Sequence, residues 1–187
     1  MEKKEDLRII KTKKNLYEGL LILLKDQSFE NVKVSDICKI SLVNRSTFYD
    51  HFQDKYELLN SLIKDLEIEF TSKLNSEKTY SSQKEYYLNL VKILFEHLNE
   101  NIDIYSKILK NNNNSIAFDI FKDSIERDVK KHINELYNGK STVPVEIITN
   151  FYVTAVISVC SEYLKDHSKY NEKEFLTYLD KLIVNII

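Results

Sequence analysis

The sequence predicts an all-α protein, and three features support this fold class. The chain of 187 residues contains only two glycines and one proline, so it offers little of the turn chemistry that a β-rich fold needs. Hydrophobic residues make up 43% of the chain, which is enough for a buried core. Along most of the sequence these residues recur three and four positions apart, which is the spacing of an amphipathic helix.

Two long helices are expected on either side of the most distinctive part of the chain. The first covers residues 5–27, and Gly19 inside it, a poor helix former, predicts that another helix crosses closely there. Phe29, in the connection that follows, is expected to turn inward. The other long helix should begin after Asp54, whose side chain is a suitable N-cap, and end near Asn75.

Residues 34–55, VSDICKISLVNRSTFYDHFQDK, predict two short helices joined by a tight turn. Three apolar side chains share one face of the first short helix: Val34, Ile37 and Cys38. After a break at residues 41–43, Asn44 can cap the second short helix by accepting hydrogen bonds from free backbone amides. Phe48 and Phe52, four positions apart, anchor that helix to a core. The pattern predicts a helix-turn-helix.

The outer surface of the second short helix carries groups that can bind DNA: Arg45, Ser46, Thr47, Tyr49 and His51. Arginine matches the O6 and N7 acceptors of guanine, serine and threonine suit several base edges, and tyrosine and histidine can donate to phosphates. The alternative for the first three residues is a solvated helix face, and for Tyr49 and His51 it is partial burial. Lys55 follows the cap at Asp54, so its ammonium and the helix N-terminus could converge on one phosphate; an ordinary surface lysine is the alternative.

A helical body over residues 54–187 is expected to follow a DNA-binding domain over residues 1–53. Beyond a polar segment at residues 76–82, helical patterns cover five further stretches: residues 83–100, 102–110, 115–137, 145–165 and 171–187. Together with the helices above, these make about nine. Aromatic side chains of the body either fill its core or line an apolar ligand pocket between helices. The pocket candidates are Phe95, Tyr105, Phe118, Phe121 and Tyr152.

The last two helical patterns are apolar around almost their whole circumference, so they must be buried on every side. They could form the centre of one subunit, but a two-fold interface between two subunits explains them better. Small residues that recur three and four positions apart would allow a partner helix to approach closely. The expected dimer interface comprises Phe151, Thr154, Ala155, Ser158, Leu179, Leu182, Ile183 and Ile186.

No pattern indicates an enzyme, a metal site or a cofactor site. The sequence lacks HExxH, GxSxG and a glycine-rich phosphate loop, and its four histidines are scattered. Asp128 and His132 share a helix face, but two ligands do not make a metal site. Cys38 and Cys160 lie in apolar patterns typical of reduced core thiols. The charged N-terminus is no signal segment, and the apolar run at residues 151–160 is too short to cross a membrane, so a cytoplasmic protein is expected.

The helix-turn-helix resembles that of the TetR/AcrR family of bacterial transcriptional regulators. The resemblance covers roughly the first third of the chain and rests on the spacing of Ile37, Val43, Phe48, Tyr49, Phe52, Lys55 and Leu58-Leu59. The chain departs from the family pattern at Lys33, where threonine is common, at Cys38, where alanine is usual, and at Leu42, where the turn usually has glycine.

The resemblance implies a three-helix head that binds DNA and a helical body that binds a ligand and dimerises. By position, the base-reading residues are Arg45, Ser46 and Thr47, while Tyr49, His51 and Lys55 contact the phosphate backbone. The full set of expected DNA-binding residues is Lys33, Ser35, Asn44, Arg45, Ser46, Thr47, Tyr49, His51 and Lys55. The partners implied are a palindromic double-stranded operator, a second copy of the chain and an apolar or aromatic effector that releases a repressor. The alternative is an activator, or an adaptor whose body binds a protein.

Overall fold

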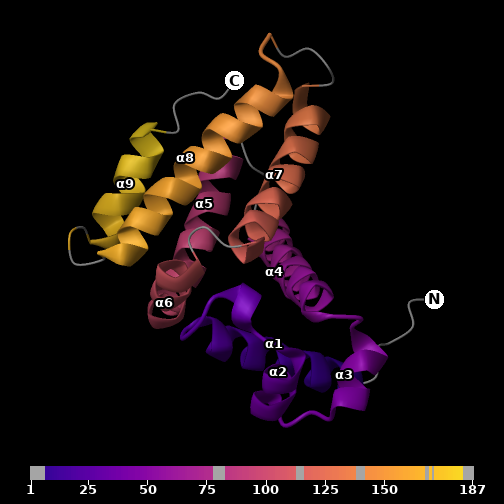
Figure 1. The fold of residues 1–187 in the computed structure, drawn as a ribbon. Coiled ribbons are helices and arrows are strands. Elements are labelled where there is room, and N and C mark those ends of the chain that lie inside the picture. The colour runs from indigo at the N-terminus through magenta and orange to yellow at the C-terminus, as the bar shows by residue number, and fades with distance from the viewer. Residues whose placement is uncertain are drawn as a thin grey trace.

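The computed structural model describes residues 7–77, 83–112, 116–137, 142–166, 169 and 171–182 (Figure 1). These residues contain nine α-helices and no strand, so the all-α prediction is confirmed. A short 3-10 turn, η1, lies between the first two helices. The elements are α1 (Leu7–Leu24), η1 (Phe29–Asn31), α2 (Val34–Ser41), α3 (Arg45–His51), α4 (Lys55–Glu77), α5 (Gln83–Glu100), α6 (Ile102–Asn112), α7 (Ile116–Tyr137), α8 (Val145–Lys165) and α9 (Glu172–Leu182).

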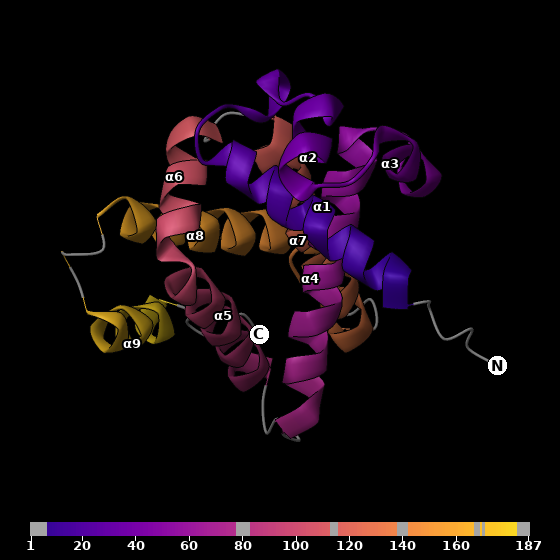
Figure 2. The same ribbon diagram turned by 90° about the horizontal axis from the view of Figure 1, so that it is seen from below.

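The helices form a small head and a larger body, and α4 belongs to both. The head helices α1, α2 and α3 lie together at one end of the molecule, and α4 runs from them into the body (Figure 1). In the body α7 and α8 pack side by side, α5 and α6 pack on α8, and α9 contacts α5. Seen from below, α1 extends from α4 toward α6, the body helix that it also contacts (Figure 2). The head is therefore held against the body along α1.

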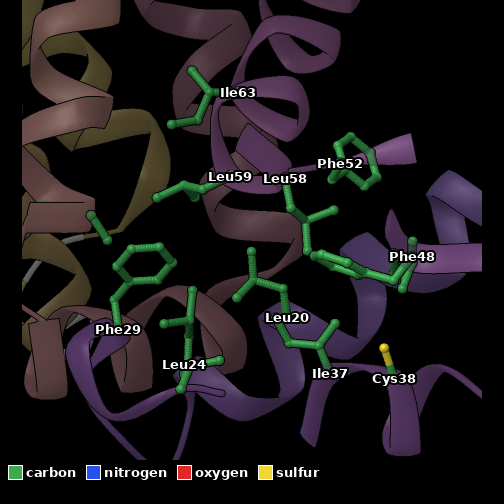
Figure 3. Close-up of a cluster of buried hydrophobic side chains, with 13 residues drawn as sticks. Leu20, Leu24, Phe29, Ile37, Cys38, Phe48, Phe52, Leu58, Leu59 and Ile63 are labelled. Carbon is green, nitrogen blue, oxygen red and sulfur yellow. The ribbon is translucent and has the colours of Figure 1, made fainter. Parts of the chain in front are cut away.

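The core of the head takes a fully buried side chain from each of its elements. Leu20 of α1, Phe29 of η1, Ile37 of α2, Phe48 of α3 and Leu58 of α4 belong to one cluster (Figure 3). Phe29 thus turns inward as predicted. Since a seven-residue helix such as α3 is not stable alone, this packing is what holds it in place.

Gly19 lies where α1 and α2 cross, and the close approach predicted there is present. A Cβ atom at this position would lie 3.3 Å from the carbonyl oxygen of Ile37 and would overlap the Ser41 hydroxyl. Ser41 is buried, and its hydroxyl donates to the Ile37 carbonyl at 2.7 Å. The absence of a side chain at Gly19 therefore sets how closely α2 packs on α1.

The turn between α2 and α3 passes through Leu42 in the left-handed conformation, with φ 55° and ψ 34°. The amide of the next residue, Val43, donates to the carbonyl of Cys38 at 3.0 Å and closes the end of α2. The Leu42 side chain is 92% exposed, so it gains no burial from this position. A left-handed residue with a Cβ atom costs roughly 1–2 kcal/mol. The turn thus keeps the geometry that glycine would favour, with a strained leucine in it.

The two predicted helix caps have different outcomes. Asp54 Oδ1 accepts hydrogen bonds from the amides of Tyr56 at 2.8 Å and Glu57 at 2.9 Å, so this cap is confirmed. Asn44 occupies the N-cap position of α3, but its side chain forms no capping hydrogen bond, and that prediction is wrong. Only the Asn44 carbonyl takes part, accepting from the Phe48 amide at 2.9 Å. Because this end of α3 is exposed, water can satisfy the remaining amides.

Helix α8 is buried along only part of its circumference in one subunit. One face packs into the body through Ile148, Val153, Ile157, Cys160 and Leu164. On another face Ile147 and Phe151 remain 60% and 67% exposed, next to the exposed residues Thr154, Ala155 and Ser158. With 21 residues, α8 is longer than the apolar run found in the sequence, and its length and composition would suit a membrane span. However, 44% of its most apolar stretch is buried inside the subunit.

Two residues that the sequence assigned to a pocket or an interface lie instead in the core of the body. The ring of Phe95 on α5 stacks on Phe175 of α9, with centroids 4.8 Å apart. Leu179, also on α9, is 3% exposed and joins the same cluster. Both predictions are corrected because α9 turns this face toward α5. Leu182 remains 66% exposed, while the predicted interface residues Ile183 and Ile186 lie outside the described part of the chain.

Candidate functional site

The helix-turn-helix, formed by α2 and α3, lies at the end of the head that is away from the body (Figure 1). The side chains exposed on it are Lys33, Ser35, Asn44, Arg45, Ser46 and Tyr49. Thr47 and His51 are half-buried. On the opposite side of α3, Phe48 and Phe52 are buried in the head core. The structure thus places these eight predicted DNA-binding residues on or beside one surface, and their contacts with DNA stay predictions.

Lys55 has a different environment from the one the sequence suggested. Its ammonium donates to the backbone carbonyls of Phe29, Glu30 and Val32 at 2.8, 2.9 and 2.9 Å. An ammonium has three donors, so these carbonyls use all of them and none is left for a phosphate. The nitrogen also lies 4.9 Å from the centroid of the Phe29 ring. Burial lowers the pKa of Lys55, with Glu30 and Asp54 opposing the shift. Lys55 therefore fastens η1 to the start of α4.

The body contains two neighbouring apolar cavities. The first, here called the distal cavity, has a volume of about 120 Å³ and lies between α4, α5, α7 and α8. Phe121 and Tyr152, two of the predicted pocket residues, line it. Its polar lining residues are Glu67, Thr71 and Asp128.

The second cavity, here called the proximal cavity, has a volume of about 140 Å³ and reaches the head. Leu21 and Leu24 of α1 line it together with residues of α4, α5, α6, α7 and α8, among them the predicted residues Tyr105, Phe118 and Phe121. Both cavities share the lining residues Ile63, Leu66, Leu94, Phe121 and Ile157. The Tyr105 hydroxyl lies 2.7 Å from His97 Nε2, and burial raises the pKa of Tyr105 to about 12 and lowers that of His97. This hydrogen-bonded pair is therefore uncharged near neutral pH.

Several polar contacts join the head to the body, and the sequence did not reveal them. The Tyr17 hydroxyl on α1 donates to Asp65 Oδ2 on α4 at 2.7 Å and lies 2.8 Å from Ser61 Oγ. In η1, Glu30 Oε1 accepts from the backbone amide of Ile116, the first residue of α7, at 3.1 Å. No helical periodicity marks Glu30, since it lies in a connection and its partner is a backbone group.

The described residues offer no further reactive centre. No three His, Cys, Asp or Glu side chains among them converge where a metal ion could bind. Cys38 and Cys160 are both free and buried. Burial raises the pKa of Cys38, against the opposing effect of Arg45, and raises that of Cys160 to about 12. Both thiols therefore stay protonated and unreactive near neutral pH.

Comparison with known families agrees with both parts of this architecture. Residues 16–62 match the family described as bacterial regulatory proteins, tetR family. Residues 85–185, more than half of the chain, match a family of transcriptional regulator C-terminal regions named for TetR. The chain belongs to the TetR family. It is accordingly a DNA-binding transcriptional regulator, and the resemblance found in the sequence is confirmed.

Individual relatives match different shares of the chain. The uncharacterized HTH-type transcriptional regulator YxbF of Bacillus subtilis (strain 168) is 38% identical over 63 residues, which are 33% of this chain and 17% of that protein. The dhaKLM operon transcriptional activator DhaS of Lactococcus lactis subsp. lactis (strain IL1403) is 29% identical over 97 residues, 52% of this chain and 48% of that protein. The matches thus span less than half of these relatives. A TetR transcriptional regulator structure from Streptococcus agalactiae 2603V superposes with a TM-score of 0.62 and 26% identity, covering 96% of this chain and 97% of that one.

TetR-family regulators typically dimerise, and one face of α8 exposes apolar side chains of the kind that a dimer interface would bury. Its large members Ile147 and Phe151 precede the small residues Thr154, Ala155 and Ser158 along α8. Small side chains would let a second helix approach α8 closely. This face contains the interface residues predicted on α8, and Ile147, which the sequence pattern did not single out, lies beside them.

Proposed function

We propose that this TetR-family protein is a dimeric repressor that binds a palindromic operator in the cytoplasm and is released by an apolar or aromatic small molecule. The observation that carries the proposal is the proximal cavity, which is lined at once by Leu21 and Leu24 of the head and by five body helices. An occupant of this cavity would touch the unit that binds DNA. No catalytic role, cofactor or membrane contact is part of the proposal.

On the DNA side, Arg45, Ser46 and Thr47 meet base edges in the major groove, since they lie at the start of a short recognition helix. Tyr49 and His51 contact phosphates, and Lys33, Ser35 and Asn44 contact the flanking strand and the backbone. Lys55 is left out, because backbone carbonyls already use its donors.

The dimer forms through α8, with the exposed end of α9 at the edge of the interface. Phe151 and Leu182, each about two-thirds exposed, would otherwise leave apolar surface in water. A two-fold axis through this face gives the molecule two heads, and two heads read two half-sites of an inverted repeat.

Release follows if the effector binds more tightly to an arrangement in which the two heads do not fit the operator. The ligand can shift the equilibrium only by its difference in affinity for the two arrangements. Helix α1 packs on α2 and carries part of the head core, so its position depends on the arrangement of the heads. A ligand that contacts α1 can therefore bind the two arrangements with different affinities.

Selection of bound DNA from a random pool tests the DNA-binding part. We expect an inverted repeat with half-sites about one helical turn apart, and an affinity that falls steeply with salt. Arg45→Ala should cost about 1–3 kcal/mol at the selected site and relax the preference at one base pair. An equal loss on every DNA sequence would contradict the base-reading role.

The dimer is tested by Phe151→Glu, with Ile68→Glu as a matched control at an exposed apolar residue of α4. We expect sedimentation to show monomers for the first variant and dimers for the second. Operator affinity should fall only for Phe151→Glu. A wild-type monomer at micromolar concentration would contradict the proposed assembly.

A second candidate function is transcriptional activation, and the similarity to the activator DhaS favours it. In that case the body could bind a protein partner in place of a small ligand. Transcription in vitro from a promoter carrying the selected operator separates the two. Repression that a small molecule relieves supports the first candidate, whereas transcription that rises when the protein is added supports the second.

A further inference from the structure

The distal cavity has an unusual charge for an apolar site. Its lining is dominated by aliphatic and aromatic side chains, but two carboxylates, Glu67 on α4 and Asp128 on α7, lie among them. No lysine, arginine or histidine lines either the distal or the proximal cavity. A ligand in the distal cavity would therefore meet negative charge without any compensating positive side chain in the wall.

Glu67 is held in place by a residue of α7, one of the helices around the cavity. It is half-buried, and its Oε1 accepts a hydrogen bond from the buried hydroxyl of Ser124 on α7. This hydrogen bond fixes the Glu67 carboxylate between α4 and α7. In the described part of the chain, no lysine or arginine forms an ion pair with Glu67.

Asp128 lies at the exposed edge of the same cavity. His132, one of its titratable neighbours, lies one helical turn further along α7. Burial lowers the pKa of His132 despite the opposing charges of Glu135 and Asp128, so the imidazole is neutral near pH 7. The negative charge of Asp128 is therefore not cancelled by this histidine.

We propose that the distal cavity takes an organic cation with an apolar or aromatic body, with Glu67 as its counter-charge and Asp128 at the entrance. This inference rests on the effector role proposed above and names the chemical class of the effector: its charged end lies in the distal cavity, and its apolar body reaches the proximal cavity past the lining residues that the two cavities share. The rings of Phe70, Phe121 and Tyr152 in the same wall offer cation–π contacts to an ammonium group. A fatty acid or another anionic amphiphile is rejected, because its headgroup would be desolvated beside carboxylates.

The experiment compares three small aromatic probes that differ mainly in charge. Phenyltrimethylammonium is a cation, tert-butylbenzene has the same shape with carbon in place of the charged nitrogen, and benzenesulfonate is an anion. Binding of each probe to the full-length protein is measured by calorimetry and by the shift in melting temperature. We expect the cation to bind about tenfold more tightly than its neutral analogue, as one good charge contact would give. We expect no binding of the anion.

Two variants separate a specific contact with Glu67 from a general effect of charge. Glu67→Gln keeps the size of the side chain and an oxygen that can accept from Ser124, while Glu69→Gln removes a charge from the same helix outside the cavity. Glu67→Gln should weaken the cation about tenfold and change tert-butylbenzene by less than about twofold. Glu69→Gln should leave both probes unchanged. Melting temperatures of the variants without ligand confirm that they fold.

Several outcomes would overturn the inference. One is tighter binding of tert-butylbenzene than of the cation by the wild-type protein, and another is an equal loss of cation binding in both variants. Failure of all three probes to bind would also overturn it. Operator affinity, measured with and without each probe, tests the effector role separately from the charge preference of the cavity. If a neutral probe releases DNA and the cation does not bind at all, the charge preference is overturned but the effector role stands. If the cation binds through Glu67 without changing operator affinity, the charge preference is supported and release by this ligand is contradicted.

Discussion

Glu30 and Ile116 join the head to the body, although 86 positions separate them in the sequence. The Glu30 carboxylate accepts from the first backbone amide of α7 at 3.1 Å, and a negative charge at this place also suits the positive end of the helix dipole. Buried Ala117, the next residue of α7, belongs to the head core. A movement of α7 around the cavities therefore reaches η1 directly, and through Lys55 it reaches α4.

We first predict that Glu30→Gln weakens this link. The loss in stability at pH 7 should be about 0.3–1 kcal/mol, because one exposed charge at a helix end is removed. Hydrogen bonds from its own backbone amide and from the Ile116 amide hold the pKa of the Glu30 carboxyl below the usual 4.5. Its contribution is thus present above about pH 4.5 and disappears as the pH falls through the lowered pKa. Urea denaturation at pH 7 and at low pH measures the difference between the two proteins.

The control for this prediction is Glu18→Gln, at an exposed carboxylate on α1. It should change stability by less than about 0.5 kcal/mol at either pH. If Glu30→Gln and the control lose the same amount, or if the loss persists when both proteins are acidified, the contact with Ile116 does not stabilise the fold.

Replacement by methionine should lower stability strongly at Lys55 and hardly at all at Lys33. Lys55→Met leaves the carbonyls of Phe29, Glu30 and Val32 without their donor and should cost about 2–3 kcal/mol of stability. Lys33→Met, at an exposed position, should change stability by less than about 0.5 kcal/mol.

The salt dependence of operator binding is the second measurement that distinguishes the Lys55 and Lys33 variants. Lys33→Met should reduce the slope of log K against log salt by about one, as expected when one phosphate contact is lost. Lys55→Met, measured well below its melting temperature, should leave the slope unchanged. A reduced slope for Lys55→Met with normal stability would restore the phosphate contact that the sequence suggested.

Most features that depend on local spacing could be predicted from the sequence, the Asn44 cap being an exception, whereas features that depend on distant partners could not. The helix-turn-helix, the inward Phe29 and the cap at Asp54 follow from neighbours within a few positions. Lys55 was misread because its partners are backbone carbonyls more than twenty positions away. Leu179 was misread because an apolar residue near the chain end looks the same whether it faces α5 or a second subunit.

Leu42→Gly should stabilise the protein. Relief of the left-handed backbone is worth about 1–2 kcal/mol, and the extra freedom of glycine in the unfolded chain offsets about 0.5–1 kcal/mol of it. The side chain is 92% exposed, so its removal sacrifices little burial. We expect a net gain of about 0.5–1 kcal/mol in urea denaturation. Leu42→Ala, which keeps the Cβ atom and the strain, should show no gain; a gain of equal size in both variants would locate the effect in the leucine side chain instead.

Gly19→Ala should loosen the packing of α1 against α2, and a second substitution can test whether the Ser41 hydroxyl is the cause. The new methyl group overlaps the Ser41 hydroxyl, which cannot rotate away without losing its hydrogen bond to the Ile37 carbonyl. Overpacking of about 1–3 kcal/mol should outweigh the gain of roughly 1 kcal/mol in helix propensity. We therefore expect lower stability and weaker operator binding, since α2 positions α3.

The double variant with Ser41→Ala decides whether this contact is responsible. Without the hydroxyl, the nearest atoms to the new methyl group are the Ile37 carbonyl oxygen and the Cβ atom of residue 41, at 3.3 and 3.4 Å. Gly19→Ala should then be neutral or stabilising, which gives a favourable coupling energy of about 1–2 kcal/mol in the double-mutant cycle. Operator affinity should recover together with stability. Additive losses in the cycle would mean that the alanine disturbs α1 elsewhere, and that the Ser41 hydroxyl does not limit how closely the two helices pack.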